Sequence, residues 1–179
     1  MMRRLQSWRK PLRYDLMPLV LAPHGGQPAY ADALSQWALW CEQHAGARVK
    51  VCVSAHWCLV ALAEHPQAVW QQYHGLTEET IQTEWVVRQL PVGEGRMLAC
   101  AVPRALMQAI IAHARQHHVQ LAWVGPWWMP SLAQSMAQSE PSAKAWVEQE
   151  PGLKVCAQFE TQPGATHQLH QLWCEALPA

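Results

Sequence analysis

Histidine pairs are the features of this sequence whose spacing comes nearest to a catalytic or metal site. His113 and His117 lie four residues apart in a segment of helical periodicity, so both imidazoles would project from one face, and His118 adds a third. A zinc-protease motif would place a glutamate between the first two, and no acidic residue lies there. Histidines in the last turn of a helix also stabilise its negative end. We therefore interpret them as helix-terminal residues and assign no metal ligand.

Two smaller groups offer weaker support for chemistry. Ser54, His56 and Cys58 contain a nucleophile and a base, but no acidic residue that would orient the base lies beside them. His167 and His170 lie three residues apart in a polar segment, and we interpret them as part of a polar tail in preference to a metal site. Hydrolase and kinase signature motifs are absent from the sequence. We expect no catalytic residue.

The turn His24–Gly26 is the candidate for a phosphate site. Two adjacent glycines let backbone amides converge on an anion before a helix that begins at Pro28. A strand-to-helix turn needs glycines for the same geometry, and two glycines alone are a weak motif. The apolar strands predicted over 97–102 and 121–125 carry no carboxylate, which argues against a nuclease. We expect no cofactor.

Tryptophan is unusually abundant, with eleven Trp against three Tyr and one Phe. Trp is enriched at the energetic centres of protein interfaces. Trp127 and Trp128 are adjacent and cannot both face inward on one helix, so we expect at least one exposed indole. With Met129 they are our candidate partner-binding residues. Basic residues are not interleaved around them, so a nucleic-acid partner is not expected there.

The amino-terminal arm carries a concentrated positive charge. The formal net charge is zero, yet five of the thirteen basic residues precede the first acidic one, Asp15. Basic residues near an anionic membrane contribute about 1 kcal/mol each, and an acidic protein is an equally suitable partner. A solvated chain end is the alternative. The arm residues that we assign to partner binding are Arg3, Arg4, Arg9 and Lys10.

Hydrophobic periodicity predicts an alternation of strands and helices. The expected elements of the first half are a strand over 16–22, a helix that begins at Pro28 and ends just before Gly46, strands over 48–53 and 57–63 that pair as a hairpin, and a weak helix over 66–80. Those of the second half are strands over 83–90 and 97–102, a helix over 103–118, a strand over 121–125, a helix over 126–138, and a hairpin of 144–149 with 153–160. We expect a flexible basic arm over 1–14, one α/β domain over 15–160 and a polar tail over 161–179.

Two segments resemble actin-like proteins of proteobacterial type IV pilus and type II secretion systems. They are RVKVCVSAHWCLVAL, residues 48–62, and RMLACAVPRALMQAIIAHARQHHVQLAWVGPWWMPSL, residues 96–132. The resemblance covers about residues 30–160 and rests on the order of apolar strands and helices. It implies an RNase H-like fold, a mixed sheet flanked by helices, and docking of a short peptide or a partner domain near the inner-membrane assembly platform.

The chain departs from that family pattern where the nucleotide would bind. The first predicted strand leads into His24–Gly26 and lacks the aspartate, glycine and hydroxyl residue that such ATPases use, and we expect the second half of the cleft to be missing. The six cysteines are scattered, which indicates buried, reduced thiols in a cytoplasmic protein. The stretch over 16–23 is too short and too proline-rich to span a bilayer.

The sequence thus predicts a non-catalytic scaffold or interaction module that docks to pilus or secretion assembly components. Its expected location is the cytoplasm, with peripheral contact at the inner membrane as a further option. The alternative is a nucleotide- or metal-binding enzyme of the same superfamily. A nucleic-acid binder that uses the basic arm is a third, weaker hypothesis.

Overall fold

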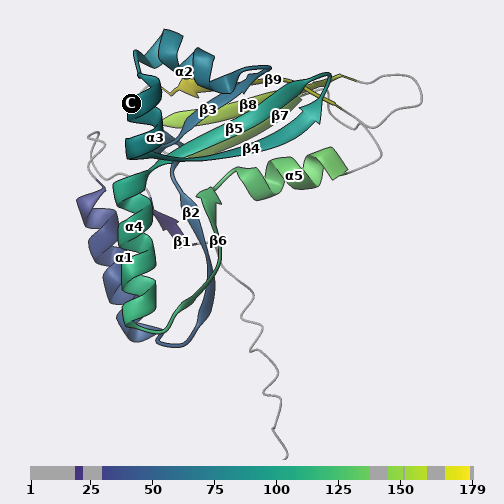
Figure 1. Cartoon of the computed structure of the whole chain (residues 1–179). Helices are drawn as coiled ribbons and strands as arrows, with labels where there is room; N and C mark the ends of the chain where they lie inside the picture. The colour runs from purple at the N-terminus through teal and green to yellow at the C-terminus, as the bar shows by residue number, and fades with distance from the viewer. Residues whose placement is uncertain (1–18, 22–29, 138–144, 151, 161–167, 178–179) are drawn as a thin grey trace, which may run out of the picture.

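The computed structural model describes residues 19–21, 30–137, 145–150, 152–160 and 168–177. Within these ranges the protein is a mixed α/β structure of nine strands, five α-helices and one short 3-10 helix. The elements in chain order are β1 Leu19–Leu21, α1 Ala31–Gln43, β2 Arg48–Val53, the 3-10 helix Ala55–Trp57, β3 Leu59–Ala63, α2 Pro66–His74, α3 Glu78–Glu84, β4 Trp85–Gly93, β5 Arg96–Pro103, α4 Arg104–Gln116, β6 Gln120–Pro126, α5 Met129–Ala137, β7 Ala145–Glu150, β8 Leu153–Glu160 and β9 Gln168–Ala176. Figure 1 shows their arrangement.

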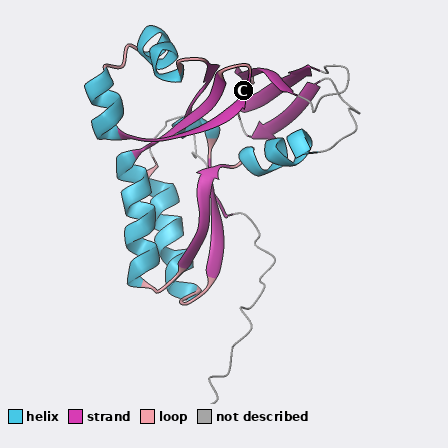
Figure 2. Cartoon of the chain, turned by 45° about the vertical axis from the view of Figure 1, so that its right-hand side comes forward, coloured by secondary structure: helices cyan, strands magenta, loops and turns pink. Residues whose placement is uncertain are grey.

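The first sheet is parallel, with strand order β1-β2-β6. Helices α1 and α4 lie side by side along one of its faces (Figures 1 and 2). Val49, Val51 and Val53 alternate along β2 and are buried in the cluster that these helices complete. The Trp37 indole nitrogen of α1 donates to the Ile110 carbonyl of α4 at 3.0 Å, so the two helices share a polar contact as well as a core.

The second sheet is antiparallel, with β5 between β3 and β4. On one face of β5 the side chains are small, Ala99 and Ala101, and Trp70 of α2 and Ile81 of α3 pack over them. Its other face bears larger side chains, of which Leu98 joins the cluster shared with the third sheet. The expectation that this strand is covered on both faces is confirmed.

The third sheet, β7-β8-β9, packs against the second sheet together with helix α5. Val155, Ala157 and Leu169 form its inner face, and Trp128 and Leu132 fill the space at the side. The predicted hairpin of 144–149 with 153–160 is therefore confirmed as β7 and β8.

The predicted hairpin between 48–53 and 57–63 is wrong. Strand β2 pairs on both edges with parallel neighbours, whereas β3 belongs to the antiparallel sheet. Between them Ser54 caps the 3-10 helix, its hydroxyl accepting from the His56 amide at 3.2 Å, and the chain leaves the first sheet there. The weak helix over 66–80 is two helices, because Gly75 ends α2 in a left-handed conformation and Thr77 caps α3.

The polar tail predicted over 161–179 contains a ninth strand, so that prediction is wrong for residues 168–176. The register shifts so that Phe159 pairs with Leu169 and Gln158 with Gln171, which leaves His170 as an extra residue. The bulge explains the misreading, since it breaks the alternation of apolar and polar residues that identifies a strand. The Arg96 guanidinium donates to the carbonyl of the extra residue, His170, at 2.8 Å and ties β9 to β5. The basic arm over 1–14 lies outside the described residues.

Candidate functional site

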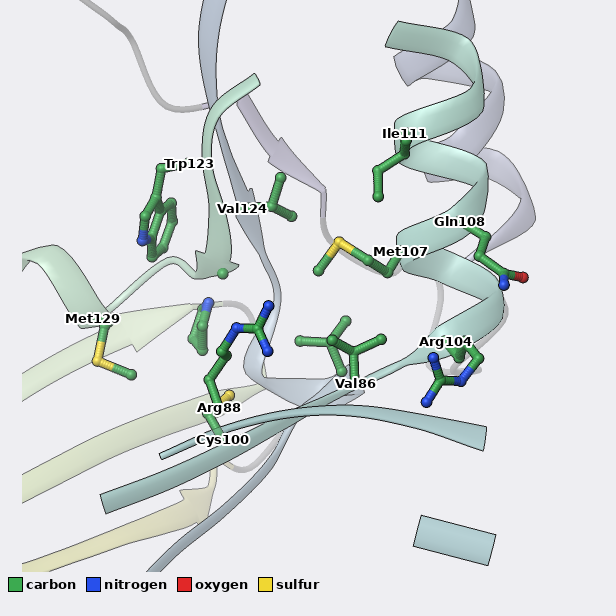
Figure 3. A pocket seen from close by; sticks show the side chains of 13 residues that line it. Val86, Arg88, Cys100, Arg104, Met107, Gln108, Ile111, Trp123, Val124 and Met129 are labelled. Atoms are coloured by element: carbon green, nitrogen blue, oxygen red, sulfur yellow. The ribbon is translucent and has the colours of Figure 1, made fainter. Parts of the chain in front are cut away.

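A groove between the first and second sheets is the candidate functional site. It has a volume of about 580 Å³, within the roughly 300–1,000 Å³ usual for binding pockets, and a mainly apolar lining. Figure 3 shows the side chains that surround it. The lining residues are Val86 and Arg88 of β4, Cys100 and Val102 of β5, Arg104, Met107, Gln108 and Ile111 of α4, Trp123, Val124, Gly125 and Pro126 of β6, and Met129 of α5.

Helix α4 supplies one wall because its apolar stripe is wider than the core requires. Leu106, Ile110 and Ala114 are buried against the first sheet. Met107 and Ile111, four residues apart at the margin of that stripe, are only partly buried and line the groove. The helix thus stabilises the fold with one row of side chains and presents the neighbouring row to the groove.

Strand β6 supplies the opposite wall, and Gly125 sets its shape. A Cβ atom added at Gly125 would lie 2.6 Å from Cζ2 of Trp123 and 3.0 Å from its Cη2. The indole therefore rests against the strand backbone at a distance that only glycine permits. Trp123 itself is partly buried and forms part of the groove lining.

Two arginines are the charged residues of the lining, and their surroundings differ. Arg104 donates to the carbonyls of Gln82 at 2.8 Å, Thr83 at 2.7 Å and Trp85 at 2.9 Å, so its guanidinium caps the end of α3. Arg88 is exposed, and its guanidinium makes a 3.3 Å contact to the carbonyl of its neighbour Val87. It has no carboxylate partner among the described residues. One arginine is thus a structural residue, and the other presents an uncompensated charge.

The predicted partner-binding residues divide between core and groove. Trp128 is fully buried in the cluster between the second and third sheets, and Trp127 is partly buried against it. The expectation of an exposed indole is therefore wrong, because these residues form the turn before α5 and both pack inward instead of sharing one helix. Met129 does line the groove. Its partner-binding role stays a prediction, and Arg3, Arg4, Arg9 and Lys10 lie outside the described residues.

The other candidate chemical groups serve local structure where the structure describes them. The Ser54 hydroxyl is buried in the 3-10 cap, and the Cys58 thiol contacts the Ser54 carbonyl at 3.4 Å. No cluster of three or more His, Cys, Asp or Glu side chains able to hold a metal occurs within the described ranges. His24–Gly26 and His167 fall outside them.

Burial suppresses the reactivity of the core thiols. Desolvation raises the pKa of the Cys41 thiol to about 11 and also raises that of Cys52, where the nearby Lys50 acts in the opposite direction. Thiolate is the reactive form, so these cysteines are packing residues.

Sequence reasoning missed the groove as a site, although it predicted the helix over 103–118 that carries Met107 and Ile111. The width of the apolar stripe of that helix, with Leu106, Ile110 and Ala114 already sufficient for the core, is the signal that could have revealed it. Arg88 and Trp123 gave no such signal, because their proximity depends on how two separate sheets pack.

Comparison with solved structures shows a distant structural likeness. No family model and no curated protein matches the sequence. The cytoplasmic domain of EpsL, an inner membrane component of the type II secretion system of Vibrio cholerae, is similar at 17% identity and a TM-score of 0.44. The match covers 81% of this chain and 56% of that chain, so the chain spans little more than half of that structure. Within the described residues, no helix combines the length and hydrophobicity needed to cross a membrane.

Proposed function

We propose that this chain is a non-catalytic interaction module that docks onto components of a type IV pilus or type II secretion assembly. The observation that carries the docking role is the groove between β6 and α4. Its lining is mainly apolar, and the described side chains that line it include no carboxylate, imidazole or hydroxyl that would serve acid–base chemistry. The one nucleophile among them, the Cys100 thiol, is buried. Shape, apolar surface and one free guanidinium are what it offers, and these suit recognition of a polypeptide.

The assignment to a pilus or secretion assembly rests on the sequence pattern over 48–62 and 96–132. Its second part, the order strand, helix, strand, helix, is present as β5, α4, β6 and α5. We further propose that the α/β fold is a divergent RNase H-like, actin-like one. The protein would then work in the cytoplasm, with its basic arm available for peripheral contact at the inner membrane.

The proposal is tested by blocking the groove and recovering partners from host cells. Ile111→Glu places a charge in the apolar lining, and Ala112→Glu makes the same helix carry the same charge at an exposed position outside the lining. Tagged wild-type protein and the Ala112 variant should recover pilus or secretion components after cross-linking, and the Ile111 variant should not. Circular dichroism and an unfolding midpoint establish that both variants fold.

Recovery of the same assembly components by a folded Ile111→Glu variant would show that the groove is not the docking site. Failure of the wild-type protein to recover any envelope component would contradict the assignment to such an assembly.

A further inference from the structure

The groove follows the edge of a strand. Four consecutive residues of β6, Trp123 to Pro126, line it. Side chains of a strand alternate between its two faces, so consecutive residues can line one groove only if the groove runs along the strand's edge. In Figure 3 the side chains of Trp123 and Val124 indeed lie on opposite sides of β6. That edge has no partner strand among the described residues, since β6 pairs only with β2 there.

We infer that an extended, acidic segment of a partner protein binds in this groove as an added strand beside β6, with Arg88 receiving its carboxylate. The inference rests on the proposed docking function and names the mode and the chemistry of the partner. Strand addition gains main-chain hydrogen bonds along the free edge and uses pockets on either side for alternate side chains.

The two sides of the β6 edge are already apolar. On one side Val124 faces Met107 and Ile111 of α4, and on the other side lies the Trp123 indole (Figure 3). Met129 of α5 also lines the groove. An added strand would direct alternate side chains into these two sides. At about 3.3 Å per residue, the four lining residues of β6 match roughly 13 Å of extended chain. A short segment with apolar residues on both faces is therefore sufficient.

The outer edge of β4, which has no partner strand in the part of the chain that the structure describes, is a poorer site for an added strand. The residues of β4 that line the groove, Val86 and Arg88, are two apart and so project from one face of the second sheet. A proline and a register shift do not separate the two edges, because β4 has Pro91 and a shift between Pro91 and Gly93, while β6 ends at Pro126 and has a shift between Leu121 and Trp123. The β4 strand thus contributes side chains to the groove and β6 contributes the backbone edge.

The charge of the partner follows from the two arginines. Arg104 donates all three of its described hydrogen bonds to backbone carbonyls and is held by them. Arg88 has one long contact to a carbonyl of its own strand, and no carboxylate of the described residues lines the groove. A carboxylate on the added strand would give this guanidinium a bidentate partner, while a basic residue would be repelled.

Peptide display tests the inference without knowledge of the natural partner. A library of random twelve-residue peptides is selected on the wild-type protein, on Arg88→Glu, on Ile111→Glu and on the control Arg115→Glu, an exposed arginine of α4 outside the lining. Peptides selected on the wild type should carry apolar residues on both faces of an extended segment, at consecutive positions, and Asp or Glu at a fixed position. Their affinity should fall at least about tenfold on Arg88→Glu and stay unchanged on Arg115→Glu. Selection on Arg88→Glu should favour Lys or Arg at that position.

Amide hydrogen exchange with a selected peptide locates the added strand. Binding should slow exchange along β6 and leave β4 unchanged. Groove-dependent peptides with no charge preference, or protection outside β6, would overturn the inference and leave the proposed docking function standing. Peptides that bind Ile111→Glu as well as the wild type would contradict both. Selection of no peptide on the wild type would overturn strand addition, while recovery of assembly components from cells would remain the separate test of docking.

Discussion

Replacement of Arg104 by alanine should loosen the junction that positions β4 against α4. The side chain joins the first turn of α4 to the end of α3 through hydrogen bonds to the carbonyls of Gln82, Thr83 and Trp85. A typical net hydrogen bond contributes about 1 kcal/mol, and a charged donor contributes somewhat more. Two of the three bonds are solvent-exposed, so water replaces part of what is lost. We expect the free energy of unfolding to fall by about 2 kcal/mol.

Urea unfolding measures this loss directly. With a slope of about 2 kcal/mol per molar urea, the midpoint should fall by roughly 1 M at unchanged slope. Arg88→Ala is a matched control, because it removes an arginine from the same groove that has only one 3.3 Å contact, and its effect should stay within about 0.5 kcal/mol. Arg104→Lys keeps the charge but not the planar fork, so it should lie between wild type and alanine. Equal midpoints for Arg104→Ala and Arg88→Ala would refute the assigned capping role.

Three further perturbations test other parts of the structure. Gly125→Ala should displace the Trp123 indole and lower the free energy of unfolding by about 1–2 kcal/mol through overpacking. In a protein that already carries Trp123→Leu, the same Gly125→Ala change should lower the urea midpoint much less. Equal losses in the two backgrounds would contradict the contact. Thiol labelling of the native protein should modify exposed Cys174 fast and buried Cys41 only on unfolding, because burial raises the Cys41 pKa to about 11; equal rates would show that the core opens. The pKa of Glu175 is lowered mainly by the hydrogen bond from Lys154 and to a smaller extent by that from Trp173. The stability that these bonds give the folded protein is therefore present above the usual glutamate pKa, and it is lost as the pH falls through the lowered value. Lys154→Gln should move the Glu175 pKa back upward in an NMR titration, and an unchanged value would refute the pairing.

The elements with a single, unbroken pattern were predictable from the sequence. Strand β5 and helix α4 follow the expected boundaries within two residues, because one is a continuous apolar run and the other begins after Pro103 with a regular apolar stripe. The pairing of strands was less predictable. Strands β2 and β3 are close in sequence and both apolar, yet only the contacts of β2 with β1 and β6 determine that they belong to different sheets.

The candidate site was only partly predictable for a related physical reason. The sequence indicated Met129 as a contact residue, but it grouped it with Trp128, which packs into the core. Burial of a side chain in a turn depends on the residues that pack against it, which here belong to the third sheet. The last strand of that sheet was not predicted, because the bulge at His170 interrupts its alternation of apolar and polar residues. Arg88 and Trp123 meet at the groove through tertiary packing, which no local pattern encodes.

The most direct test of the central claim, that the groove beside β6 is where this protein docks, is photo-crosslinking in host cells. A photoreactive amino acid replaces Met107, inside the groove lining, or Ala112, an exposed residue of the same helix outside it. We predict a specific adduct with a component of the envelope assembly from position 107 and none from position 112. The same adduct from both positions, or none from position 107 in the folded protein, would contradict the claim.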